Sequence, residues 1–420
     1  MASLSSRVSD LLDIAGEVYK HDRLVKRPGR RGAAFGPAQQ RQLRVEVPVR
    51  EREFWIESDV SHKLCDVLRW LTRDRWEFDF VPFETRRRQA EQVMRLWSTP
   101  LAEGGQVALF SGGLDALIGA AMLSERYGSV ALVAVGTNPR QIRVQRELFR
   151  KIGVLADGVV PVHVPAGLRG ASRLNQERTQ RTRAFLNLSI ATAAAQAGDA
   201  SAINLCENVI GAMNLPYSPR QIGIDMSRAA HPITLQKMSE LISAVLERRL
   251  PIVNPLFGMT KAQGCRELPL EWLPLVPITV SCDIGFTDRR QGDALLCGRC
   301  SSCVLRRQAL WAAGLSDLDA QDRYRFDFLK GDAGGEALRA MITQVIRLRT
   351  VATQWPDLVG AIPEVDDVVA GLLQSGQCET ELQAHSRIEY ALATYASEWR
   401  FVPSPAIQTR ISATSLAAAA

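Results

Sequence analysis

Short apolar runs alternate with longer segments of helical spacing between residues 106 and 208. The runs are rich in β-branched residues, as in SVALVAVG (129–136) and GVVPVHVP (158–165), and similar runs begin at positions 106 and 200. The segments between them, such as PRQIRVQRELFRKIG (139–153), repeat apolar residues three and four positions apart, which is typical of helices. Strands that are apolar throughout occur in parallel sheets with helices on both faces. The pattern therefore predicts a doubly wound α/β domain, with ligands at the carboxyl ends of its strands.

The sequences on either side of this region have different patterns. Strand-like alternation and helical spacing mix in the first hundred residues, with strands expected at 41–49 and 76–83 and helices at 59–71 and 86–97. A stretch rich in Gly, Pro and Arg at 27–40 predicts a loop. Beyond about residue 310 the spacing is mostly helical. We therefore expect an N-terminal α+β accessory domain (1–100), the doubly wound domain (101–310) and a helical C-terminal extension (311–420).

Composition and charge narrow the function classes only slightly. The chain has 420 residues, is 46% hydrophobic and carries a formal charge of +6. It has no uninterrupted apolar run of the length that a membrane helix needs and no secretory signal at its start, so we expect a cytoplasmic protein. Basic residues gather near 26–31 and 86–88. Such runs can bind nucleic-acid phosphates, but no aromatic residues are interleaved with the run at 26–31, so a solvated basic face is the favoured interpretation.

One loop between a predicted strand and a predicted helix has the composition of an anion-binding site. Two glycines permit a tight turn and a close backbone approach, and the helix that follows offers free N–H groups and a positive dipole end. An ordinary strand-to-helix turn is the alternative. Asp115 could hold a magnesium ion or orient nucleotide groups. The loop consists of Phe110, Ser111, Gly112, Gly113, Leu114, Asp115 and Ala116.

Four cysteines near residue 300 have metal-ligand spacing. Fourteen residues separate Cys282 from Cys297, and two residues separate each of the next pairs, Cys297 from Cys300 and Cys300 from Cys303. Four thiolates in such short spacings suit a tetrahedral Zn²⁺ knuckle, and a [4Fe–4S] cluster is the competing occupant. Because four protein ligands leave no open position, we expect the metal to support folding rather than chemistry.

The loop resembles the SGGxDS loop of the PP-loop (HUP-like) ATP pyrophosphatases, with Ala116 in place of the usual Ser. The Ser281-Cys282 pair and the segment from Cys297 to Arg306 resemble the cysteine region of the QueC family, the 7-cyano-7-deazaguanine synthases. Arg183 through Leu188 and the Thr260-Lys261 pair resemble further elements of that family, as does Asn254-Pro255-Leu256. The resemblance covers roughly residues 105–310.

This resemblance implies an activity and a set of cofactors. Members of the family use ATP to adenylate the carboxylate of 7-carboxy-7-deazaguanine, after which ammonia displaces AMP and a second activation yields the nitrile. By analogy, the loop residues from Phe110 to Ala116 would bind ATP, and Asp115, Arg183 and Lys261 would be catalytic. The implied cofactors are ATP, Mg²⁺ and a structural Zn²⁺ held by the four cysteines.

Four polar residues are candidates for contact with a deazaguanine-like substrate. Glu207 and Asn208 follow a predicted strand, where a carboxylate and an amide can pair with the edge of a guanine-like ring. Arg228 and His231 could bind the substrate carboxylate or move protons. A histidine that caps the turn before Pro232 is an equally good interpretation of His231.

The long flanks resemble those of QatC-like proteins from bacterial anti-phage defence islands. That resemblance implies a defence protein with partner proteins from the same system, one of which could supply the amine that receives the activated carboxylate. Two alternatives are a PP-loop enzyme that modifies tRNA, which the basic runs favour, and a subunit that binds nucleotide without turning it over, which Ala116 favours.

Overall fold

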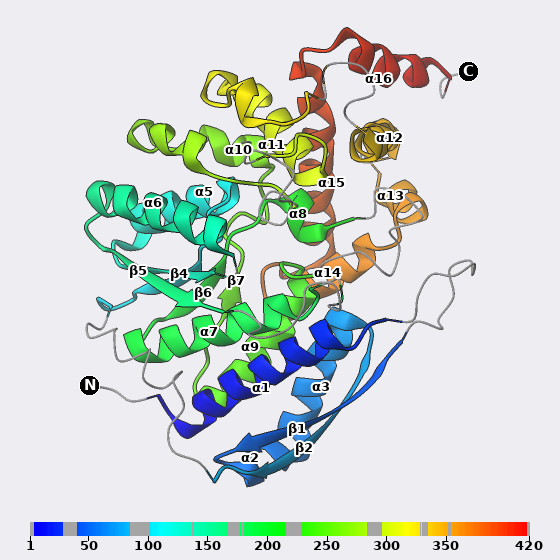
Figure 1. The fold of residues 1–420 in the computed structure, drawn as a ribbon. Helices are drawn as coiled ribbons and strands as arrows, with labels where there is room; N and C mark the ends of the chain where they lie inside the picture. Colours follow the sequence, from blue (N-terminus) through cyan, green and yellow to red (C-terminus); the bar gives the residue numbers. More distant parts are fainter. Residues whose placement is uncertain are drawn as a thin grey trace.

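The computed structural model describes residues 4–27, 40–84, 101–136, 138–166, 177, 180–215, 228–283, 296–327, 329, 335–351 and 354–417. The predicted loop at 27–40 and the predicted helix at 86–97 lie largely outside these ranges. A central sheet carries helices on both faces, with the N-terminal segment below α7 and α9 and the C-terminal helices at the opposite end of the molecule (Figure 1).

Five parallel strands form the central sheet, four of them at the apolar runs that predict strands and the fifth, β7, at a two-residue segment that the sequence pattern did not predict. They are β3 (Gln106–Leu109), β4 (Val130–Gly136), β5 (Val159–Pro165), β6 (Ala202–Leu205) and β7 (Ile252–Val253), in the order β5-β4-β3-β6-β7. From β3 the chain first moves outward through β4 and β5, and then returns to the other side of β3 through β6. The order therefore reverses between β3 and β6, and the carboxyl ends of these two neighbouring strands form the crevice where such sheets bind ligands.

Helices cover both faces because the strands bury side chains on both. On β4, Leu132 and Ala134 join one core with α5 (Leu114–Tyr127) and α6 (Pro139–Leu155). The alternate residues Ala131 and Val133 join a second core with α7 (Arg183–Gly198) and α9 (Pro232–Leu246). The doubly wound α/β fold predicted from the sequence is confirmed.

The N-terminal segment is a small α+β unit built on a parallel strand pair. It comprises α1 (Ser6–Leu24), β1 (Gln42–Val49), α2 (Arg52–Ile56), α3 (Ser58–Thr72) and β2 (Arg75–Pro82), with β1 and β2 paired from Gln42–Arg75 to Val49–Pro82. Helix α1 packs along α7, and α3 packs against α9. As a result, the apolar side chains of α1 and β1 belong to the same core as those of α7 and α9.

A buried ion network links this segment to the start of α7. Arg41 lies between two carboxylates, with its Nη2 2.5 Å from Asp22 and 2.6 Å from Asp74. The other oxygen of Asp22 accepts hydrogen bonds from the backbone N–H and the hydroxyl of Thr182, at 3.2 Å and 3.0 Å. Thr182 directly precedes α7, so the network fixes α1 and β1 against the beginning of that helix.

Helices make up the C-terminal third, as the spacing predicts. They are α11 (Ser301–Ala312), α12 (Gly335–Val351), α13 (Trp355–Ala361), α14 (Val365–Gln374), α15 (Glu381–Glu398) and α16 (Pro405–Ala417). Two short helices, α8 (Val209–Met213) and α10 (Lys261–Arg266), and the 3₁₀ segments Leu270–Ile278, Ser316–Leu318, Gln321–Arg323 and Trp399–Phe401 complete the described elements. Within the described residues, every helix is too short or too polar to cross a membrane.

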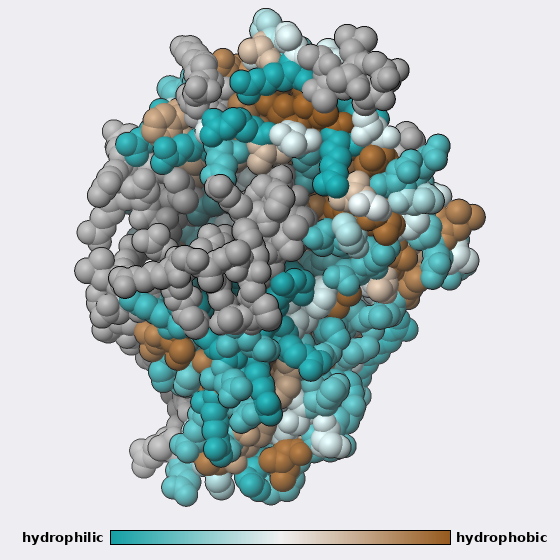
Figure 2. Space-filling model, turned by 90° about the vertical axis from the view of Figure 1, so that its right-hand side faces the viewer, coloured by the Kyte–Doolittle hydropathy of each residue, from teal (hydrophilic) through white to brown (hydrophobic). Residues whose placement is uncertain are grey.

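The surface in Figure 2 is mostly hydrophilic where its residues are coloured. Apolar side chains are visible there in small groups between hydrophilic ones. Scattered apolar groups of this kind are usual on a solvent-facing surface.

Candidate active site

The loop after β3 has the geometry that its glycines predict. Gly112 has φ +85°, in the left-handed region that glycine adopts without a steric penalty. Its carbonyl accepts a hydrogen bond from the backbone N–H of Val280 at 3.0 Å. The N–H of Gly113 donates to the hydroxyl of Ser111 at 3.2 Å, and α5 begins at the next residue. The loop therefore presents backbone and small side chains at the positive end of a helix.

Helix α6 supports this loop from one side. The side-chain amide of Gln145 donates to the carbonyls of Phe110 and Ser111, at 3.4 Å and 3.3 Å. The buried ring of Phe110 packs on Phe149, with 5.1 Å between ring centroids. Ala116 is buried in the core beneath the loop, where the resembled families have a serine. The loop is thus fixed by main-chain contacts that do not depend on the side chain at position 116.

A buried cluster of charged and polar side chains lies beside the loop. Asp115, at the start of α5, forms an ion pair with Lys261, at the start of α10. The side-chain amide of Asn208 donates to both oxygens of Asp115 at 3.3 Å and to Glu207 at 3.0 Å. Glu207 and Asn208 lie one residue beyond the end of β6, so the cluster forms where the strand order reverses.

The environment sets the protonation of this cluster. Burial, and after it the nearby Asp115 carboxylate, raises the pKa of Glu207 to about 8, although Lys261 opposes both effects. For Lys261, burial lowers the pKa, but Asp115 and Glu207 outweigh burial and the net pKa is raised. At neutral pH the lysine is charged and Glu207 is largely protonated, so one cation faces one carboxylate and a neutral acid.

Local sequence holds the second strand end in place. The amide oxygen of Asn208 caps α8 by accepting from the N–H groups of Ile210 and Gly211, at 3.2 Å and 3.3 Å. The side chain of Asn254 binds the main chain of Glu207 on both sides, accepting from its N–H at 3.2 Å and donating to its carbonyl at 2.7 Å. A Cβ atom at Gly211 would lie only 2.1 Å from the Glu207 carboxyl oxygen, so a larger residue there would displace the Glu207 side chain.

The helix start at Lys261 is fixed by a capping box. The hydroxyl of Thr260 accepts from the N–H of Gln263 at 3.1 Å, and the Gln263 side chain accepts from the N–H of Thr260 at 2.8 Å. This reciprocal pair satisfies two backbone donors and sets the direction of α10. Lys261 is therefore held at its backbone as well as at its ammonium group.

The four predicted cysteines come together in one group. Their sulfur atoms all lie within 4.8 Å of one another, with 3.8 Å between Cys297 and Cys303 and 3.9 Å between Cys282 and Cys300. A tetrahedral ion with Zn–S bonds of about 2.3 Å requires sulfurs about 3.8 Å apart. A [4Fe–4S] cluster binds each thiolate through a different iron, which requires a wider group. The distances therefore fit a single tetrahedral ion.

Backbone N–H groups also point at this sulfur group. Cys297 Sγ accepts from the N–H groups of Arg299 and Cys300, at 3.4 Å and 3.3 Å, and Cys282 Sγ accepts from the N–H of Cys297 at 3.4 Å. Such an environment favours the thiolate form that a metal ion binds.

The cysteine group is connected directly to the loop. Ser281 precedes the first cysteine, and its hydroxyl accepts from the N–H of Leu114 at 3.1 Å, at the start of α5. The carbonyl of Ser281 lies 3.6 Å from the sulfur of Cys303. Arg306, fully buried on α11, binds the hydroxyl of Thr279 at 2.7 Å. The loop and the cysteine group therefore share the backbone segment 279–282.

Three predicted site residues lie elsewhere. Arg183 is exposed at the start of α7, close enough to Tyr19 to affect its pKa. The guanidinium of Arg228 stacks over Trp70 of α3 at 3.8 Å and donates to the Trp70 carbonyl at 3.1 Å. His231 caps α9 by accepting from the N–H of Ile233, and its ring lies 5.2 Å from that of Trp70. The capping interpretation of His231 is confirmed, and its role toward substrate stays a prediction.

Burial and the charge of Arg228 lower the pKa of His231 to about 3, so this ring is neutral at physiological pH. Burial also lowers the pKa of Arg228, to about 10. Arg228 and His231 join α9 to the N-terminal segment through their contacts with Trp70. Among the described residues, neither forms an ion pair like that between Asp115 and Lys261.

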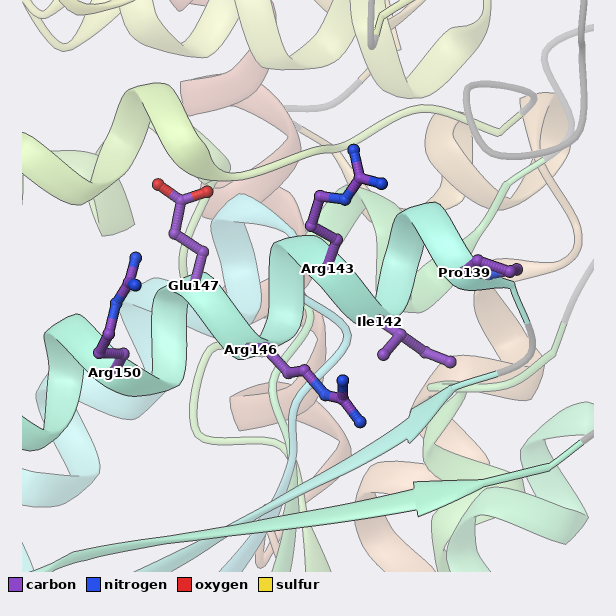
Figure 3. Close-up of a pocket in the computed structure, with 6 residues that line it drawn as sticks. All are labelled: Pro139, Ile142, Arg143, Arg146, Glu147 and Arg150. Atoms are coloured by element: carbon purple, nitrogen blue, oxygen red, sulfur yellow. The ribbon is translucent and has the colours of Figure 1, made fainter.

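A cation-rich cavity of about 700 Å³ lies on the outer face of α6. Figure 3 shows Arg143 and Glu147 projecting from one side of the helix and Arg146 from the other. Arg150, Ile142 and Pro139 complete the lining. Since Gln145 on the inner face binds the loop, α6 separates this cavity from the loop.

Several residues that organise the site were not predicted as site residues. Asn254 and Ser281 belong to sequence elements that resemble the QueC family. Their polar side chains, which can hydrogen-bond to the main chain, were the sequence feature that could have marked them. Thr260 carries the signal of a helix cap, three residues before Gln263. Gln145 lies in the middle of α6 and has no sequence signal that distinguishes it from a surface glutamine.

Comparison with known proteins places these features in one family. The model of the family described as queuosine biosynthesis protein QueC matches residues 105–314, which is half of the chain and includes the loop, the charged cluster and all four cysteines. A curated protein, 7-cyano-7-deazaguanine synthase 1 of Sphingopyxis alaskensis, is 28% identical over 231 residues. That alignment covers 50% of this chain and 95% of the relative.

Proposed function

The chain belongs to the QueC family, and from this premise we propose that it is an ATP-dependent synthase that activates a carboxylate on a 7-deazaguanine-type substrate. The observation that carries the proposal is the pairing of Asp115 with Lys261 beside the glycine loop, at the reversal point of the sheet. The name of the relative from Sphingopyxis supplies the substrate class. Carboxylate is a poor electrophile, so its conversion to an adenylate is the step for which ATP is needed.

In this proposal the loop binds the phosphates of ATP. The carboxylate oxygen of the substrate attacks the α-phosphorus, the bond from that phosphorus to the bridging oxygen breaks, and pyrophosphate leaves. Negative charge then grows on the departing pyrophosphate. In this proposal the positive end of the α5 dipole and the ammonium of Lys261 stabilise this charge.

The carboxyl groups of Asp115 and Glu207 are the oxygen ligands that would hold Mg²⁺, which neutralises phosphate charge when bound. Glu207 is the more adaptable of the two, because its raised pKa allows it to lose a proton when a cation arrives. Asn208 is already engaged with Asp115 and with the cap of α8, so we assign it to holding the cluster. Glu207 then remains the candidate for contact with the substrate base.

We also propose that the four cysteines bind one Zn²⁺ with a structural role. Four thiolates complete a tetrahedral shell, so the ion has no position for substrate. Its contribution is to hold the segment 279–282 against the loop, through the hydrogen bond from Leu114 N–H to Ser281.

The second step transfers the activated acyl group to an amine. Attack by ammonia forms the C–N bond of an amide and releases AMP, and a second activation would remove the amide oxygen to give a nitrile. The amine of a partner protein is an alternative acceptor, in keeping with the resemblance of the flanks to QatC-like defence proteins. Arg228 and His231 remain proposed contacts for the substrate, and Arg183 remains a proposed catalytic cation that neutralises charge.

A second candidate function is a nucleotide-binding subunit without turnover. Ala116 favours it, since the buried methyl group replaces a hydroxyl that the resembled loops direct at pyrophosphate. Both functions require ATP binding, and only the first yields AMP and pyrophosphate.

The test is mass spectrometry of reactions that contain the purified protein, Mg-ATP and 7-carboxy-7-deazaguanine, with and without ammonium. We expect AMP, pyrophosphate and an amide or nitrile, and we expect the Asp115→Asn variant to form none of them. If ATP binds and stays intact, including when candidate partner proteins are added, the second function replaces the first. Enrichment of tRNA with the purified protein, together with ATP turnover that requires tRNA, would instead favour a tRNA-modifying enzyme.

A further inference from the structure

Helix α15 of the C-terminal extension lies directly against the elements that carry the charged cluster. It packs against α8, which follows Glu207 and Asn208, and against α11, which carries Cys303 of the cysteine group. The hydroxyl of Tyr390 lies 3.5 Å from the side-chain amide of Gln263 in α10. The family match ends at residue 314, so α15 lies outside the part of the chain that the family model covers.

One contact from α15 reaches the residue next to Lys261. A carboxyl oxygen of Glu398, the last residue of α15, accepts a hydrogen bond from the hydroxyl of Thr260 at 2.8 Å. Glu398 is only 3% exposed, and Arg266 of α10 lies 3.6 Å from the same oxygen. A carboxyl group is costly to bury without partners. Of these two partners, Thr260 lies at the start of α10 and Arg266 at its end.

The hydroxyl of Thr260 is both a donor and an acceptor. A hydroxyl has one proton to donate, and here that proton goes to Glu398. The lone pairs then face the helix, where one accepts from the N–H of Gln263. Glu398 therefore orients the hydroxyl that caps α10, and Lys261 is the first residue after that cap.

We propose that Glu398 is a positioning residue for Lys261, acting through Thr260, and that α15 is part of the framework of the active site. The proposal deepens the proposed function, because it rests on Lys261 as the cation that stabilises the departing pyrophosphate. The C-terminal extension thereby has a specific role: it holds the ammonium group of Lys261 beside Asp115 and the glycine loop, where it stabilises the departing pyrophosphate.

The main test compares Glu398→Ala with Glu398→Gln and with Glu381→Gln, a control at an exposed residue of the same helix. The glutamine side chain keeps an oxygen that accepts from Thr260, so we expect Glu398→Gln to retain kcat within about threefold. Misplacement by about 1 Å can lower a rate about 100-fold. We therefore expect Glu398→Ala to lower kcat about 10- to 100-fold with little change in the KM for ATP, and Glu381→Gln to change neither.

A double variant separates positioning from general loss of stability. If the two residues act as one unit, Thr260→Val and Glu398→Ala will each lower kcat, and the double variant will be no slower than the slower single variant. Independent, multiplying losses would overturn the proposal. So would a Glu398→Ala protein that melts at a lower temperature but has wild-type kcat when assayed well below its melting point.

A third measurement does not need turnover. Lys261 is buried and paired, so an amine-reactive acylating reagent should label it slowly in the wild type and several-fold faster in Glu398→Ala. If the wild type has no ATP turnover, the proposed function fails, and this labelling still decides whether Glu398 holds Lys261. Equal labelling of Lys261 in both proteins would refute the positioning role.

Discussion

Replacement of Lys261 by methionine is the most direct test of the charged cluster. Methionine keeps most of the volume of the lysine stem and removes the ammonium group that pairs with Asp115. The Asp115 carboxylate would then keep only the amide of Asn208 as a donor from the cluster, at 3.3 Å. Loss of one partner from a buried ion pair costs about 3–5 kcal/mol, because the other charge stays buried. That is a large part of the ~5–15 kcal/mol by which proteins are stable.

Chemical denaturation at pH 7 measures this cost as a loss of unfolding free energy. The variant Asp115→Asn/Lys261→Met removes both charges, and we expect it to be more stable than Lys261→Met alone, since no unpaired charge remains. Lys63→Met serves as the matched control, because Lys63 pairs with the exposed Asp59 on α3 and such pairs contribute about 0.3–0.5 kcal/mol. A cost below about 1 kcal/mol for Lys261→Met, or a double variant as unstable as the sum of the single ones, would refute the reasoning.

Three further predictions concern neighbouring groups. The folded-state pKa of Glu207, about 8, lies above its ordinary value of 4.5. The stability gained from its protonation is therefore fully present below pH 4.5 and is lost as the pH rises through 8. The melting temperature should fall less steeply over this pH range for Glu207→Gln than for the wild type, and identical slopes would contradict the assignment. Ser281→Ala removes the acceptor of the Leu114 N–H and should cost about 1 kcal/mol, measured by denaturation against a Ser281→Thr control that keeps the hydroxyl. Elemental analysis should find one zinc per chain, and Cys300→Ser should lower both the zinc content and the melting temperature; iron with acid-labile sulfide would disprove the zinc assignment.

The fold was predictable because its signals are local. Strands β3, β4, β5 and β6 coincide with apolar runs, whereas the two-residue β7 is too short to give such a signal, and β1 alternates buried and exposed side chains along its length. Parallel pairing follows from the helices between the strands. The contact of α1 with α7 was not predictable, because an amphipathic pattern shows that a helix buries one face and does not show against what.

The site was predictable where its residues are close in sequence. The glycine loop and the cysteine group are compact motifs, and their residue types leave few chemical alternatives. Asp115 and Lys261 are 146 positions apart, and only the family resemblance connected them before the fold did. Glu398 is 138 positions from Thr260 and has no sequence feature that distinguishes it from a surface glutamate.

Arg228 and His231 illustrate why chemistry alone is a weak guide. Both residue types suit a substrate carboxylate, and the sequence cannot show that Trp70 and the start of α9 surround them. Burial then changes their properties, since it leaves His231 neutral at physiological pH. Arg183, by contrast, is exposed at the start of α7, and its predicted role as a catalytic cation stays a prediction.

The burial of α7 affects how such a chain can change during evolution. Residues of α7 are buried on nearly every side, against the sheet on one face and against α1 on another. A version of the protein without its first hundred residues would expose the apolar face that α1 covers, and exposed apolar patches of that kind favour aggregation or association. Gain or loss of the N-terminal segment must therefore be accompanied by new side chains on α7. The α/β domain and the N-terminal segment are therefore expected to change together during evolution, because they share a core, and not to be exchanged as independent modules.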